Sequence, residues 1–81
     1  MSVLKKIQKV FAIDSSSVLL ELGCGTGRSV FWFALVIHAT VYGIEQIPIF
    51  MQQALKLKYR YQVSGAHFYM GNFLFVPWPE N

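Results

Sequence analysis

Apolar residues recur along this chain in two patterns, one typical of amphipathic helices and one typical of buried strands. A helix is predicted over residues 2–11, because lysines separate apolar residues that recur at helical spacing: Val3, Leu4, Ile7, Val10 and Phe11. Further along, short apolar runs predict strands and longer segments predict helices. The order is strand 18–22, helix 28–38, strand 41–45, helix 48–60 and strand 67–70.

This alternation of elements predicts the fold class. A β-α-β-α-β order preceded by an N-terminal helix is typical of α/β proteins with a parallel sheet and right-handed crossovers. Helices are expected on both faces of such a sheet, which explains why the strands are almost wholly apolar. We therefore expect a three-layer, Rossmann-like parallel sheet in one partial domain over residues 1–81.

The composition indicates that this domain does not hide all of its apolar residues. The chain has 81 residues, of which 54% are hydrophobic and 14% are charged, whereas charged residues usually make up about a quarter of a soluble domain. A chain of this size buries only about 60% of its unfolded surface. Some apolar surface must therefore meet another chain, a membrane or a remainder of the domain.

Charge, cysteine and histidine content exclude several functions. The net charge is +3. The positions of the lysines and arginines are typical of the solvent-exposed faces of helices and do not indicate a nucleic-acid-binding patch. One cysteine and two histidines predict neither a disulfide nor a metal site, and they fit a reducing, cytoplasmic location. We find no signal peptide, and the uncharged segment 29–44 is too short to span a bilayer. Membrane association through residues 30–37 is a third functional hypothesis, beside the two that are given at the end of this section.

The segment with the clearest chemistry is the turn between the first predicted strand and the next helix. Residues 21–27 are Glu-Leu-Gly-Cys-Gly-Thr-Gly, and three glycines at alternate positions let a backbone approach a ligand closely. The unpaired N–H groups that open the following helix would point toward that ligand. Arg28 stands where the dinucleotide fingerprint has its third glycine, and no Gly-Lys-Ser/Thr of a P-loop follows. Without a ligand, this segment would be a flexible turn.

Two carboxylates flank this turn and indicate the charge of its ligand. Glu21 precedes the turn and would repel a pyrophosphate, but it suits a cationic ligand such as S-adenosylmethionine. Glu45 ends the second predicted strand at about the spacing, ~20 residues, at which an acidic residue reaches a ribose hydroxyl in Rossmann-like sites. The alternative for Glu45 is a solvated strand end.

These residues resemble motifs of the class I S-adenosylmethionine-dependent methyltransferases. Glu-Leu-Gly-Cys-Gly-Thr-Gly is similar to their first motif, Tyr-Gly-Ile-Glu at 42–45 to their second, and Gly-Asn-Phe at 71–73 to the Gly-Asp-Phe that flanks the adenine. The three matches span residues 18–78 in the family's order. Trp78 adds a likeness to a group of histone lysine methyltransferases within this family.

The resemblance implies a role for each matched residue. The backbone of Gly23, Gly25 and Gly27 would pass the methionine part of S-adenosylmethionine, with Cys24 as a small residue between them. Glu21 would meet the ammonium group of the cofactor.

The other matched residues would hold the nucleoside. Glu45 would accept hydrogen bonds from the ribose hydroxyls, Asn72 would face the adenine amino group, and Phe73 would lie against the adenine ring. Asn72 replaces the usual aspartate, so its amide oxygen can still accept a hydrogen bond, but without charge assistance. No catalytic residue is assigned.

The family's sheet continues beyond the first strand, which leads to two functional hypotheses. The segments that bind the methyl acceptor would lie beyond residue 81, so the chain resembles the cofactor half of a truncated methyltransferase. The first strand would then be an open apolar edge, and we predict a homo-oligomer that covers it. The alternative is a non-enzymatic assembly module that retains the fold.

Overall fold

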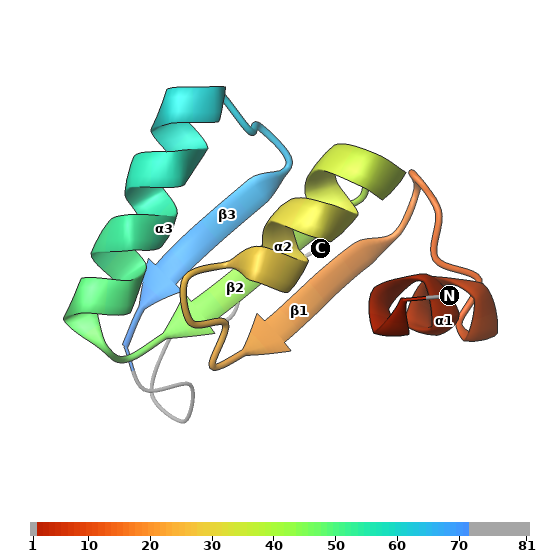
Figure 1. The fold of residues 1–81 in the computed structure, drawn as a ribbon, viewed down its shortest axis with the longest axis horizontal. Helices are drawn as coiled ribbons and strands as arrows, with labels where there is room; N and C mark the ends of the chain where they lie inside the picture. Colours follow the sequence, from red (N-terminus) through yellow and green to blue (C-terminus); the bar gives the residue numbers. More distant parts are fainter. Residues whose placement is uncertain (1, 72–81) are drawn as a thin grey trace.

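The computed structural model describes residues 2–71 and contains every element that the sequence predicts there (Figure 1). Each boundary agrees with the prediction to within about two residues. The elements are α1 (Val3–Val10), β1 (Val18–Leu22), α2 (Arg28–Trp32), the π-helix η1 (Phe33–Ile37), β2 (Thr40–Glu45), α3 (Pro48–Tyr61) and β3 (Ala66–Met70). The roles predicted for Asn72, Phe73 and Trp78 lie outside the described residues.

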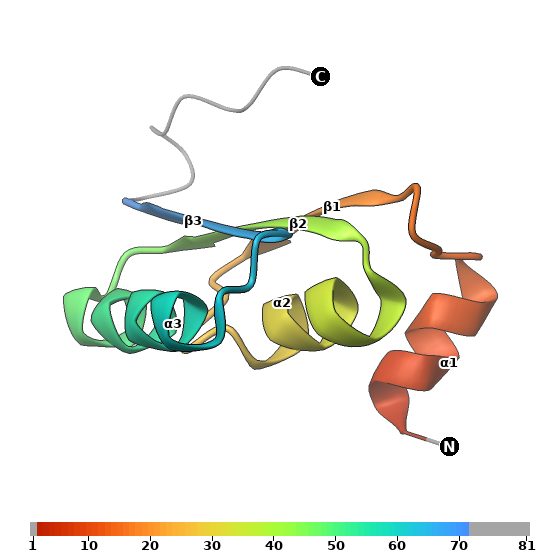
Figure 2. The same ribbon diagram turned by 90° about the horizontal axis from the view of Figure 1, so that it is seen from above.

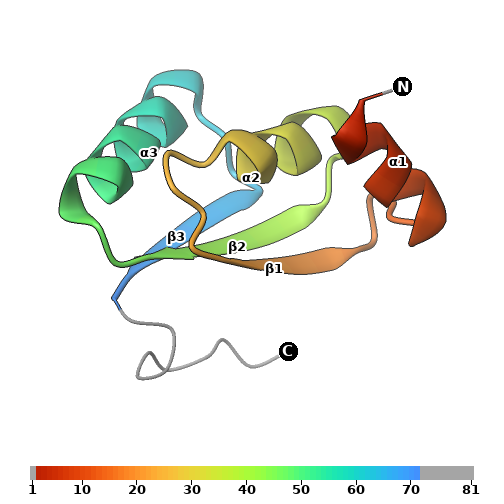
Figure 3. The ribbon, with the colours of Figure 1, turned by 60° about the horizontal axis from the view of Figure 1, so that its bottom comes forward.

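The three strands form one parallel sheet in the order β1-β2-β3. Tyr42 at the centre of β2 is in register with Leu20 of β1 on one side and with His67 of β3 on the other. The segment 41–45 is therefore extended beside 18–22, as the predicted cofactor site requires. Because the strands are parallel, the carboxyl ends of β1 and β2 meet at one end of the sheet, and the loops to α2 and α3 start there (Figure 3).

The helices differ from the expected three-layer arrangement. Helices α2 and α3 lie on the same face of the sheet, and no helix among residues 2–71 covers the other face (Figure 2). The reason is topological: both crossovers are right-handed and both advance in the same direction across the sheet, from β1 to β3. The Rossmann-like parallel sheet is confirmed, while the described residues form two layers.

The core lies between the sheet and these helices. Its centre is formed by Val30 of α2 and Val41 of β2, which are 0% and 1% exposed. The other buried members of this cluster come from the loops, from η1 and from β3: Ile13, Cys24, Phe33, Ala34, Ala39, Val63 and Ala66. Met51 and Ala54 of α3 are also buried.

The opposite face of β1 is apolar and exposed. Burial alternates along the strand, so that Leu19 and Glu21 face the helices while Val18, Leu20 and Leu22 remain 55%, 50% and 48% exposed. No strand within residues 2–71 pairs with the outer side of β1. We call this outer side, together with the three exposed side chains, the β1 edge. Its apolar character agrees with the surplus of hydrophobic residues in the composition.

The second helix changes its winding halfway. It starts as α-helix at Arg28 and widens to a π-helix from Phe33 to Ile37, where His38 ends it in a left-handed conformation with φ +64°. Phe33 and Ala34 are buried, whereas Leu35 and Val36 are about half exposed. The sequence predicts one helix over 28–38, and the helical span is confirmed, although its second half is a π-helix. Within residues 2–71 no helix combines the length and the hydropathy that a membrane crossing needs.

Candidate functional site

The glycine loop, residues 23–27, joins β1 to α2 and presents an open backbone surface. Gly23 and Gly25 have φ values of +66° and +60°, a conformation that suits glycine because other residues carry a Cβ that clashes there. A Cβ built on either residue would meet no atom within 4 Å. The loop is therefore not packed shut, and a ligand can approach its backbone closely at these two positions.

Gly27 has a different environment from the other two glycines. It is buried, with φ +88°, and a Cβ at this position would lie 2.9 Å from the Phe68 ring and 3.1 Å from the Phe31 ring. These two rings pack against each other with centroids 5.4 Å apart. The third glycine thus allows α2 to start close to β3, and the open part of the loop belongs to Gly23 and Gly25.

Cys24 anchors the loop to the sheet. Its side chain is buried and so close to β2 that a Cβ on Gly43 would lie 2.9 Å from the sulfur. The backbone N–H groups of Gly23 and Cys24 both donate to the carbonyl of Ile44, at 2.8 and 3.1 Å. Cys24 thus lies in the turn as predicted, and its side chain points into the core.

The pKa of the Cys24 thiol depends on burial and on the charges around the loop. Burial raises its pKa to about 11, with further contributions from the carboxylates of Glu21 and Glu45. The raised pKa favours the protonated thiol, which is a poor nucleophile. The same two carboxylates give the loop a negative potential, which favours a cationic ligand.

Glu45 is buried at the end of β2, where its carboxylate holds two loops. One oxygen accepts a hydrogen bond from the N–H of Gly25 at 2.7 Å, and the other accepts one from the N–H of Ile47 at 2.9 Å. Only 5% of the residue is exposed. Each carboxylate oxygen has two lone pairs, so both can accept a further hydrogen bond. The predicted ribose acceptor thus lies against the open loop, and it also positions that loop.

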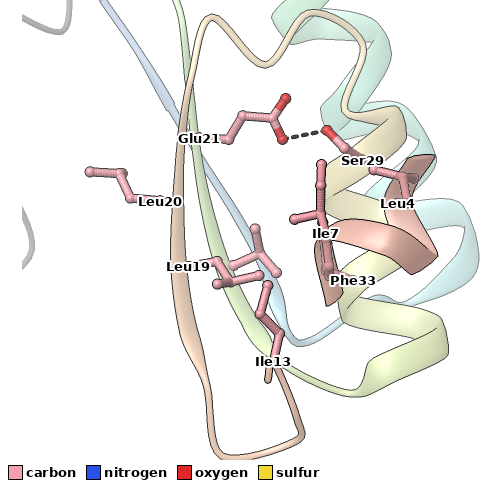
Figure 4. Close-up of a pocket in the computed structure, with 9 residues that line it drawn as sticks. Leu4, Ile7, Ile13, Leu19, Leu20, Glu21, Ser29 and Phe33 are labelled. Carbon is pink, nitrogen blue, oxygen red and sulfur yellow. Dashed lines mark hydrogen bonds between the residues drawn. The ribbon is translucent and has the colours of Figure 1, made fainter. Parts of the chain in front are cut away.

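Glu21 lies at the end of β1 and faces the helices. Its Oε2 accepts a hydrogen bond from the hydroxyl of Ser29, in the first turn of α2 (Figure 4). Glu21 and Ser29 line a pocket of about 390 Å³ between α1, β1 and α2. The other walls are apolar and include Leu4 and Ile7 of α1 (Figure 4). The carboxylate therefore lies in a partly desolvated place, where an interaction with a cation is stronger than in water.

The structure brings together most of the residues predicted for the cofactor site. Glu21, Gly23, Cys24, Gly25, Gly27 and Glu45 all lie in the loops and strand ends at the carboxyl side of β1 and β2 (Figure 3). Among residues 2–71 no cluster of three potential metal ligands occurs. Ser29 was not among the residues predicted for the site. A polar side chain in the first turn after the glycines is the signal that could have found it.

Comparisons with known proteins identify the family of this chain. Residues 13–81 match the sequence profile of a family described as a methyltransferase domain, and the chain belongs to this family. A search of the curated proteins gave no match. The resemblance to class I methyltransferases in the sequence is thereby confirmed at the level of the family.

Solved structures share the same fold. An RNA methyltransferase from Salinibacter ruber in complex with S-adenosyl-L-homocysteine is 28% identical, with a TM-score of 0.82, and the match covers 91% of this chain and 49% of that one. A dimethyladenosine transferase from Plasmodium falciparum is 26% identical, with a TM-score of 0.77, and 96% of this chain matches 28% of that one.

A coclaurine N-methyltransferase bound to N-methylheliamine and SAH has the same fold at 15% identity. Its TM-score is 0.83, and the match covers 95% of this chain and 23% of that one. In each of these three comparisons the chain spans half or less of the length of the solved protein.

Proposed function

We propose that this chain binds S-adenosylmethionine at the glycine loop and forms the cofactor-binding half of a methyltransferase. The observation that carries the proposal is the open loop surface at Gly23 and Gly25 beside the carboxylates of Glu21 and Glu45. Family membership and the S-adenosyl-L-homocysteine in the Salinibacter ruber structure support it.

The described residues fit the two ends of this cofactor. The cofactor supplies a methyl group on a positively charged sulfur, together with an ammonium group, and the negative potential at the loop suits both charges. Glu45 would accept hydrogen bonds from the ribose hydroxyls, and Glu21 would take the ammonium. Gly23 and Gly25 leave room for the methionine part. Asn72 and Phe73 remain predicted contacts of the adenine.

Methyl transfer would require a second half that binds the acceptor. In methyl transfer the protein mainly holds nucleophile and methyl group in line, and the described residues contain no surface that we can assign to an acceptor. The solved structures with this fold include an RNA methyltransferase and a small-molecule N-methyltransferase. The fold therefore favours no particular acceptor, and we propose activity only when the acceptor-binding half is supplied.

Calorimetric titration with S-adenosylmethionine and S-adenosylhomocysteine tests the cofactor proposal. The 81-residue chain should bind both ligands at one site per chain, because both carry the ribose and the ammonium that the two carboxylates would contact. Adenosine 5′-monophosphate serves as the control ligand, since its phosphate would face a negative loop and should bind more weakly. A folded chain that gives no heat with either ligand would contradict the proposal.

The alternative function is an oligomeric assembly module, and the β1 edge supports it. An exposed apolar strand edge is a template for pairing with another chain. The same edge also supports a homo-oligomer of the cofactor half, in which two copies pair across a two-fold axis. A silent titration by an oligomer would favour the module, and cofactor binding would favour the methyltransferase half.

Light scattering tests the homo-oligomer. The chain should have a mass at least twice its monomer mass of 9.3 kDa. Leu20→Lys places a charge in the middle of the β1 edge on both copies and should shift the protein toward monomer. Tyr59→Lys on α3, where the side chain is 72% exposed and remote from β1, is the matched control and should leave the mass unchanged. A monodisperse wild-type monomer would exclude the oligomer.

We also propose a cytoplasmic location. The chain's one cysteine, Cys24, is a buried free thiol, which suits a reducing compartment.

A further inference from the structure

Ser29 is in contact with a predicted cofactor residue, yet nothing in the motif assigns it a role. It lies in the first turn of α2, two residues after the glycine loop, and its hydroxyl donates to Oε2 of Glu21. The bond joins residues eight positions apart in the sequence, from the end of β1 to the start of α2. Both side chains are partly buried and line the pocket between α1, β1 and α2.

This hydrogen bond limits the freedom of the Glu21 carboxylate. A glutamate side chain has several rotatable bonds, and fixing them on ligand binding costs entropy. The Ser29 hydroxyl holds one oxygen in place before any ligand arrives. The second oxygen points away from Ser29 (Figure 4), and among the described residues it has no hydrogen-bond partner. It is therefore the oxygen that can accept from a ligand.

The apolar surroundings of Glu21 make the orientation of its carboxylate important for binding. Apart from Ser29, the pocket walls around Glu21 are hydrophobic side chains, so few groups compete for the carboxylate on that side. The charge of a partly desolvated carboxylate acts strongly, but only on a cation in the correct position. A carboxylate that turned toward solvent would lose this advantage.

We propose that Ser29 is a positioning residue that holds Glu21 for the ammonium group at the amino-acid end of the cofactor. This inference rests on the proposed function. Ser29 would act through Glu21, so its contribution belongs to the amino-acid end of the ligand and not to the adenosine. The two ends can be separated by experiment, because 5′-methylthioadenosine contains the adenosine and the sulfur but lacks the amino acid.

Titration of two variants with two ligands tests the inference. Ser29→Ala should weaken the binding of S-adenosylhomocysteine by about three- to tenfold. This is less than the loss of a direct hydrogen bond to a charged group, because Ser29 acts on the ligand only through Glu21. Its affinity for 5′-methylthioadenosine should stay at the wild-type value. Ser29→Thr keeps the hydroxyl and should restore the binding of S-adenosylhomocysteine. Ser64→Ala, an exposed serine in the loop before β3, is the control and should change neither affinity.

The possible outcomes separate this inference from the proposed function. A wild-type chain that binds neither ligand refutes the proposed function itself. If the wild-type chain binds both ligands and Ser29→Ala lowers the two affinities equally, Ser29 only supports the fold. Unchanged binding of S-adenosylhomocysteine by Ser29→Ala also overturns the inference. A selective loss that threonine rescues supports it.

Discussion

Gly27→Ala is expected to lower the free energy of unfolding by about 3 kcal/mol. Two costs add up. The left-handed conformation at φ +88° is unfavourable for alanine by about 1 to 2 kcal/mol. The new Cβ would also lie 2.9 Å from the ring of Phe68 and 3.1 Å from that of Phe31, and overpacking of this kind costs about 1 to 3 kcal/mol. Unfolding in guanidinium chloride, followed by circular dichroism, measures the loss.

Gly25→Ala is the matched control for this prediction. Its φ of +60° imposes a similar conformational cost, but the new Cβ would meet no atom within 4 Å. The variant should therefore lose only about 1 to 2 kcal/mol, the cost of the left-handed conformation. The difference between the two variants isolates the packing of Gly27 against the phenylalanine rings. Equal losses would show that α2 can move away from Phe68 at little cost.

Glu45→Ala is expected to reduce the affinity for S-adenosylhomocysteine by more than about tenfold, since it removes the predicted acceptor of the ribose hydroxyls. The same change leaves the N–H groups of Gly25 and Ile47 without their carboxylate, which should cost about 2 to 4 kcal/mol of stability. Calorimetric titration measures the first effect and chemical denaturation the second.

The two effects of Glu45→Ala need controls that keep them apart. Glu45→Gln retains the shape and one acceptor oxygen, so both losses should be smaller than with alanine. Gln46→Ala changes the exposed neighbour and should affect neither property. Titrations are made only at a temperature where circular dichroism shows each variant folded. A folded Glu45→Ala chain with wild-type affinity would remove Glu45 from the cofactor site.

The sequence predicted the elements well because local pattern and tertiary structure agree. The strand Val18–Leu22 starts with an apolar run and is followed by a glycine. Pro48 occupies the first turn of α3, where its missing N–H costs nothing. Gly65 lies in the turn between α3 and β3. There, a Cβ would lie 3.0 Å from the carbonyl oxygen of Ala39, so close approach of the backbone also requires glycine.

Other features were not predictable from local pattern. The π-helix at Phe33–Ile37 has the same apolar composition as an α-helix, and nothing in the sequence marks the change. The separate environment of Gly27 depends on Phe68, which lies far away in the chain and approaches only through the sheet. The expectation of three layers followed the general rule for parallel sheets, whereas the direction of the two crossovers decides where the helices lie.

In the candidate site, too, some features were predictable from the sequence and others were not. The motif placed Glu21, Gly25 and Glu45 near one another, and the structure has Glu45 in direct contact with the loop at Gly25. The motif could not show that this carboxylate also holds the N–H of Ile47, because that contact depends on the path of the chain into α3. The contact between Ser29 and Glu21 likewise depends on how α2 returns over β1.

The helices on a single side of the sheet have a practical consequence for protein engineering. Within residues 2–71, β1 has no outer strand and the face opposite α2 and α3 carries no helix (Figure 2). A polypeptide could therefore add a strand along β1, with its own helices on that face, without displacing α2 or α3. Under the proposed function, the chain would suit fragment complementation, in which a separately produced acceptor-binding piece is added to the cofactor-binding one. Different second pieces could then be screened against the same first piece for different methyl acceptors.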